Sequence, residues 1–149
     1  KMTMTTQESD AKFAVDAANG GMAEVALGKL AQQQASSAAV KDFANMMVTD
    51  HSKANDELMA LAKSKNITLP DSVSNDKKQA MMDLSKKTGA DFDKAYVDMM
   101  IDGHQKTIDL FEDESKNGKD ADIKAFADKT LPTIKMHLTH IQSIHDSMK

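Results

Sequence analysis

The sequence predicts an all-α protein built as a four-helix bundle. Ala, Leu, Met and Lys are common, aromatic residues make up 4% of the chain and Trp is absent. That balance favours helix over sheet. Apolar residues also recur at spacings of three and four along four long segments, a pattern typical of helices that bury one face.

The first helix is predicted from about Ser9 to Gln34, after a flexible segment of residues 1–8. Its apolar stripe consists of Phe13, Ala17, Gly20, Leu27 and Ala31. Glu24 falls in the same register. The Gly20-Gly21 pair is costly inside a helix, so we expect a local bend or the close approach of another helix there. Residues 9–149 are predicted to form one domain.

The second helix is predicted from about Ser37 to Lys65, where Leu58 and Leu61 continue a stripe that contains His51. The rest of that stripe is Val40, Phe43, Met47 and Ala54. A Leu-Pro pair at residues 69–70 stops any helix in the segment that follows.

The segment from about Asn66 to Ala90 is long enough to run the length of the bundle. A short helix is predicted within it from Asn75 to Lys87, ending at Gly89. A crossover of this length lets the second and third long helices run parallel, which is the arrangement of ferritin-like folds. We therefore predict a ferritin-like four-helix bundle whose crossover carries a short extra helix.

The third long helix is predicted from Asp91 to about Lys116 and the fourth from about Asp120 to Ser147. The stripe of the third contains Val97, Met100, His104, Ile108 and Phe111. The stripe of the fourth contains Ile123, Phe126, Thr130, Ile134, His137, Ile141 and Ile144.

Each long helix thus places one metal-competent residue on its apolar stripe: Glu24, His51, His104 and His137. Counted from the turns between paired helices, their heights differ by only about one helical turn, at about 1.5 Å per residue. Burying a carboxylate is costly without a partner or a metal. Three imidazoles and one carboxylate in a bundle core suit a transition metal, with zinc first and copper, iron and nickel as alternatives.

A buried polar network that fixes the packing of the four helices is the alternative to a metal site. His140 and His145 lie off the main stripe or near the chain end, and we expect both to be solvated. Elemental analysis of protein purified without an affinity tag separates the two interpretations.

Neighbouring residues add weaker signals. Met47 and Met100 lie one turn before the first two histidines, where thioethers would favour Cu(I). We expect core packing instead, because Met is a common core residue. Asp50 and Asp102 could hydrogen-bond to the metal-binding residues and orient them, but we expect both to be surface charges.

Composition excludes several classes of function. The net charge is −4 and all 19 basic residues are Lys, so bidentate Arg contacts to nucleic acid are absent and nucleic acid is not an expected partner. There is no Cys, which excludes thiolate sites and disulfides. No segment has the apolar length of a transmembrane helix. No catalytic motif is present, and the sequence indicates no particular protein partner.

The chain resembles an uncharacterised family of exported bacterial proteins with a ferritin-like four-helix fold, often labelled predicted outer-membrane proteins. The resemblance covers about residues 9–147 and is carried by residues 24–28 (Glu-Val-Ala-Leu-Gly), Asp50-His51, Tyr96 to His104, Leu131-Pro132 and His137-Leu138. It implies export to the periplasm or cell envelope, and we expect a processed chain whose signal peptide has been removed. It implies no established activity.

Di-iron ferritins use a Glu-x-x-His pair on two helices. Here Val48, Ile101 and Ile134 stand three residues before the stripe histidines. The carboxylates that bridge two irons are therefore missing, and ferroxidase activity is not expected. We predict a mononuclear metal-binding protein of the cell envelope, serving sequestration or stress protection. The alternative is a metal-free structural or interaction module.

Overall fold

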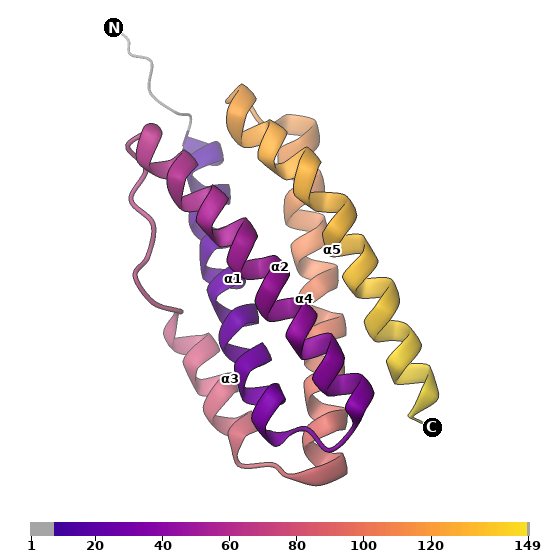
Figure 1. Cartoon of the computed structure of the whole chain (residues 1–149). Coiled ribbons are helices and arrows are strands. Elements are labelled where there is room, and N and C mark those ends of the chain that lie inside the picture. Colours follow the sequence, from indigo (N-terminus) through magenta and orange to yellow (C-terminus); the bar gives the residue numbers. More distant parts are fainter. Residues whose placement is uncertain (1–7, 149) are drawn as a thin grey trace, which may run out of the picture.

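The structure is a computed structural model that describes residues 8–148. It contains five helices and, within these residues, no strand. Four are long: α1 (Glu8–Gln34), α2 (Ala38–Ser64), α4 (Gly89–Asn117) and α5 (Ala121–Ser147); α3 (Asn75–Ser85) is short (Figure 1). The prediction of an all-helical chain is confirmed. Of the predicted flexible segment, residues 1–7 lie outside the described residues, and Glu8 already belongs to α1.

Polar side chains cap the helices where the sequence predicts their starts. Ser37 precedes α2, and its hydroxyl accepts a hydrogen bond from the backbone N–H of Val40. Asp120 precedes α5 and accepts from the N–H groups of Asp122 and Ile123, both at 3.0 Å. Such caps satisfy N–H groups that have no partner within the helix.

The long helices form two antiparallel pairs, α1 with α2 and α4 with α5 (Figure 1). After α2, the chain returns along the outside of α1 through a loop and α3, so that α2 and α4 run in the same direction. The parallel course predicted for these helices is confirmed.

The start of α4 differs from the prediction. The short helix ends at Ser85, and Gly89 is the first residue of α4, with a φ of 58°. A positive φ is inexpensive only for a residue without a Cβ. The glycine therefore serves the entry to α4 rather than the exit from α3.

The apolar core is divided into two clusters. One surrounds the end at which α1 meets α2 and includes Leu27, Ala31, Phe43, Met47, Phe92, Tyr96, Met100 and Ile141. The other lies toward the opposite end and includes Phe13, Ala14, Leu58, Phe111, Ile123, Phe126 and Ile134. The four residues singled out in the sequence fall between the two clusters along their helices.

Of the two adjacent glycines in α1, Gly21 lies against α2 and Gly20 does not. A Cβ on Gly21 would collide with the side-chain amide of Asn55, whereas Gly20 has open space. A Cβ on Gly28 would come within 2.8 Å of the Val48 side chain and 3.1 Å of the Ala44 carbonyl oxygen. Close approach of the two helices therefore accounts for Gly21 and Gly28. None of the described helices combines the length and the apolarity needed to cross a membrane.

Candidate metal centre

The structure brings the four predicted residues together. His51 on α2, His104 on α4 and His137 on α5 each offer a ring nitrogen, and these nitrogen atoms lie within 4.8 Å of one another. Glu24 on α1 lies beside two of the three histidines. Its Oε2 atom lies 3.4 Å from Nε2 of His104 and 3.9 Å from Nε2 of His51.

All four side chains are withdrawn from water. The exposed fraction is 0% for His137, 1% for His104 and 8% for His51, and 13% for the Glu24 side chain. Each residue occupies a core-facing position of its helix, as the spacing of the apolar residues predicts. The apolar clusters on both sides keep this layer buried.

Two of the imidazoles are oriented by hydrogen bonds on the side away from the cluster. Nδ1 of His104 donates to the backbone carbonyl of Met100 at 2.7 Å. Nε2 of His137 donates to a carboxylate oxygen of Asp50, also at 2.7 Å. A neutral imidazole carries one N–H, so each bond leaves the other nitrogen with a lone pair. A partner that holds the second nitrogen is typical of metal-binding histidines.

Three buried ring nitrogens have no hydrogen-bond partner among the described residues. They are Nε2 of His51, Nε2 of His104 and Nδ1 of His137, and all three atoms are buried. An unpartnered buried polar atom costs about 1–3 kcal/mol. Three of them in one small space are costly for a domain of this size.

Burial keeps the imidazoles neutral. It lowers the pKa of His51 to about 3, assisted by the charges of His137 and His104. It lowers the pKa of His104 to about 4, although the bond to the Met100 carbonyl acts in the opposite direction. The pKa of His137 is also lowered by burial, partly offset by Asp50. Imidazole must be neutral to coordinate a metal, so near pH 7 these side chains are already in the binding form.

Burial also changes the protonation of Glu24. It raises the pKa of Glu24 to about 7, against the opposing charge of Lys77 on α3. Near neutral pH the carboxyl group is therefore divided between its protonated and ionised forms. A nearby cation would favour the ionised form.

The structure settles the roles of the neighbouring residues. The expectation that Asp50 is a surface charge is wrong, because it holds His137. Asp102 instead pairs with Lys106 on the surface, as expected. His140 is exposed and Met47 is fully buried in the core, also as expected.

Sequence analysis missed three buried carboxyl groups and one hydroxyl. Asp10, Asp93 and Glu114 are at most 4% exposed, and the hydroxyl of Tyr96 is buried without a partner among the described residues. A signal was present. The three acidic residues stand three positions from Phe13, Tyr96 and Phe111 respectively, in register with the apolar stripes.

The comparisons with known proteins identify the family. A family model described as a domain of unknown function (DUF4142) matches residues 1–144. The chain therefore belongs to the DUF4142 family. No curated protein matches the chain.

Two solved structures share the fold. A DUF305 fragment from Deinococcus radiodurans superposes with a TM-score of 0.82 at 9% identity, over 95% of this chain and 97% of the fragment. CopM in its Cu(I)-bound form superposes with a TM-score of 0.79 at 14% identity, over 95% of this chain and 98% of CopM. Identities this low establish similarity of fold alone.

Proposed function

We propose that this DUF4142 protein binds one transition-metal ion through Glu24, His51, His104 and His137. The observation that carries the proposal is that three histidines bring ring nitrogens within 4.8 Å of one another and that each has a buried ring nitrogen without a partner among the described residues. One cation placed among them would bind a lone pair of each imidazole and neutralise the carboxylate of Glu24. Four protein ligands form a closed site, which suits sequestration or a structural role better than catalysis.

The geometry is compatible with such an ion after a small contraction. Tetrahedral bonds of about 2.0–2.1 Å to nitrogen or oxygen separate ligand atoms by about 3.4 Å. The distance between the Glu24 Oε2 and His104 Nε2 atoms is already 3.4 Å. The widest separation among the three imidazole nitrogens, 4.8 Å at most, has to close by about 1.4 Å.

The donor set narrows the choice of metal. Imidazole suits zinc, copper, iron and nickel, and affinity for divalent ions generally peaks at copper. We propose zinc or copper as the leading candidates. Zinc is favoured by a set of imidazole and carboxylate donors that numbers four, and copper by the fold shared with the Cu(I)-bound CopM.

One ion, rather than two, is part of the proposal. Among residues 8–148, the histidine cluster is the one group of three or more potential ligands that lie close enough together to hold a metal. A di-iron centre requires further carboxylates to bridge the irons. Rapid oxidation of two Fe(II) ions per chain is therefore not expected.

The setting of this site is also proposed. We propose that the bundle is ferritin-like, which the long crossover and the parallel course of α2 and α4 support. We propose export to the periplasm or cell envelope, supported by the sequence resemblance and the absence of Cys. There the site would sequester a metal or protect against metal stress.

Calorimetric titration tests the site. Protein purified without a tag is stripped of metal, analysed for its elemental content, and titrated with Zn, Cu, Ni and Fe ions. The expected result is about one ion per chain and an affinity that His51→Ala lowers by more than about 100-fold, beyond the usual cost of losing a residue that only orients a ligand. His145→Ala is the matched control, because its imidazole is 43% exposed, and it should change little.

A metal-free polar network is the second candidate function. It is favoured by the distance of 3.4 Å between Glu24 and His104, across which one proton can be shared. That proton satisfies Nε2 of His104, and the single N–H of His51, which either of its ring nitrogens can carry, is the remaining donor for Nδ1 of His137. Equal losses of affinity in the two variants, or no binding of any of the four metals, would favour the network.

A further inference from the structure

The histidine cluster is buried, yet one surface groove reaches it. The groove lies between α2 and α5, has a volume of about 300 Å³, and is lined in part by His51 and His137. Two other surface pockets have similar volumes, about 330 and 270 Å³. Neither is lined by any of the four site residues.

A second, much smaller space adjoins Glu24 and His51 on the side of α1 and α4. Its volume is about 30 Å³, and its lining includes Asp16, whose side chain is 42% exposed. It is large enough for about one or two water molecules. His51 lines both this small space and the surface groove, and it therefore stands between the site and the groove.

The wall of the groove contains groups that suit the passage of a cation. Asp50 lines it and has a side chain that is 32% exposed while it holds His137. Met136, a residue 52% exposed, forms part of the outer wall. Of the positive charges on the wall, Lys129 is paired with Glu57 at 2.6 Å, which reduces its repulsion of an incoming ion.

We propose that the α2–α5 groove is the route by which the metal ion reaches and leaves the site. This inference rests on the proposed function and adds the path by which the ion reaches the metal site. The ion passes Met136 and Asp50 and meets His51 and His137 first, because those two imidazoles face the groove. Glu24 and His104 are reached last.

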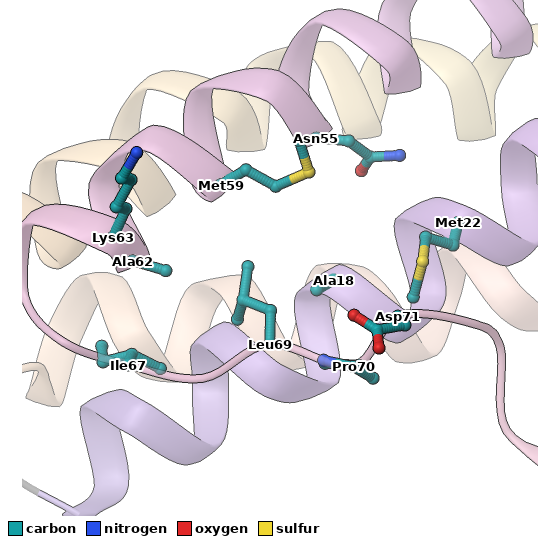
Figure 2. Close-up of a pocket in the computed structure, with 10 residues that line it drawn as sticks. All are labelled: Ala18, Met22, Asn55, Met59, Ala62, Lys63, Ile67, Leu69, Pro70 and Asp71. Carbon is teal, nitrogen blue, oxygen red and sulfur yellow. The ribbon is translucent and has the colours of Figure 1, made fainter.

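The chain offers a matched pair of substitutions for the test. Met136 lines the α2–α5 groove, and Met59 lines the pocket between α1 and α2 shown in Figure 2. Both are helical methionines of similar exposure, 52% and 55%. Met136→Trp fills the proposed route, and Met59→Trp makes the same change at a pocket that does not touch the site. Thr133→Trp is a second plug, from a half-buried position on the groove wall.

The measurement is the rate of Zn²⁺ loading by stopped flow and of Zn²⁺ release to an excess of 4-(2-pyridylazo)resorcinol, with the affinity measured separately. An obstructed route slows both rates by the same factor and leaves Kd unchanged. We expect a slowing of about tenfold or more for the two plugs and none for Met59→Trp. Met136→Leu, which keeps the side-chain size but lacks sulfur, should load at the rate of the unsubstituted protein.

Each outcome decides the question. Wild-type rates in both plug variants, with their helical content intact by circular dichroism, would overturn the route and leave the metal site standing. An equal slowing by Met59→Trp would also overturn it. A higher Kd in a Met136 variant, caused by faster release at an unchanged loading rate, would mean that Met136 binds the ion rather than lines its route. If the unsubstituted protein binds no Zn²⁺, both the route and the proposed site for zinc fall.

Discussion

Two sets of buried polar residues in this bundle differ in whether the chain itself supplies their hydrogen-bond partners. At the ends of the bundle, backbone N–H groups satisfy the carboxylates of Asp93 and Asp10, whereas Oε2 of Glu114 has no partner among the described residues. Asp93 accepts hydrogen bonds from the N–H groups of Ser36 and Ser37 at 2.9 and 3.0 Å. Asp10 accepts from those of Lys119 and Asp120 at 3.1 and 2.8 Å. These contacts fasten α4 to the α1–α2 turn and α1 to the α4–α5 turn.

In the middle of the bundle, the corresponding bonds are not made. Three buried imidazole nitrogens have no hydrogen-bond partner among the described residues. Buried polar groups in folded proteins are nearly always hydrogen-bonded, and a group that is not needs an explanation. Buried atoms of Gln34, Tyr96 and Glu114 also lack partners among the described residues. It is therefore the clustering of three histidines within 4.8 Å, and not the lack of partners alone, that is expected of residues that bind an external cation.

The largest effect on stability is expected at the ends. Asp93→Ala removes the acceptor of two backbone N–H groups, and should lower the free energy of unfolding by about 2–4 kcal/mol, with or without metal. Urea unfolding monitored by circular dichroism measures this. Asp91→Ala, at an exposed position in the same first turn, is the control. A loss in Asp93→Ala no larger than in Asp91→Ala would remove the distinction between the two regions.

The next largest effect is expected on metal affinity rather than on the stability of the fold. Asp50→Asn weakens the acceptor that orients His137, and should lower metal affinity by about 10–100-fold. Calorimetric titration measures the loss. Asp102→Asn is the control, since Asp102 is exposed on α4 and pairs only with Lys106 among the described residues. Unchanged affinity in Asp50→Asn would show that the bond to His137 plays no part in binding.

Glu114 differs from the two end carboxylates in its protonation. Burial first, then a hydrogen bond that its protonated carboxyl group donates to Asp10 and the repulsion of the Asp10 charge, raise the pKa of Glu114 to about 8, from an ordinary value of 4.5. Between these values the unfolded chain has released a proton that the folded chain still holds. The contribution of Glu114 to stability is therefore full below about pH 4.5 and is lost as the pH rises toward 8.

Glu114→Gln should remove this pH dependence. Its stability relative to the parent should increase as the pH is raised from 5 to 9, as measured by urea unfolding at each pH. Glu112→Gln, on the same helix with a side chain 39% exposed, should not change the pH profile. Parallel profiles for Glu114→Gln and the parent would mean that Glu114 is ionised in the folded protein at neutral pH.

The contrast also shows which parts of the molecule were predictable. The spacing of apolar residues determines the face of a helix, and residue counts determine height. The four helices, the clustering of the three histidines and the position of Glu24 beside two of them therefore followed from the sequence. Hydrogen bonds between residues far apart in the chain could not be predicted from the sequence. Asp10 is bound to a backbone N–H 110 residues away, and Asp50 to an imidazole 87 residues away. Such bonds depend on rotamers and helix offsets that periodicity does not specify.

X-ray absorption spectroscopy of the zinc-loaded protein, purified without a tag, tests the central claim most directly. The account predicts a spectrum of three imidazole nitrogens and one further light atom at about 2.0–2.1 Å, with one imidazole fewer in His104→Ala. Sulfur in the first coordination sphere, or an unchanged spectrum in His104→Ala, would show that the metal binds elsewhere and would contradict the account.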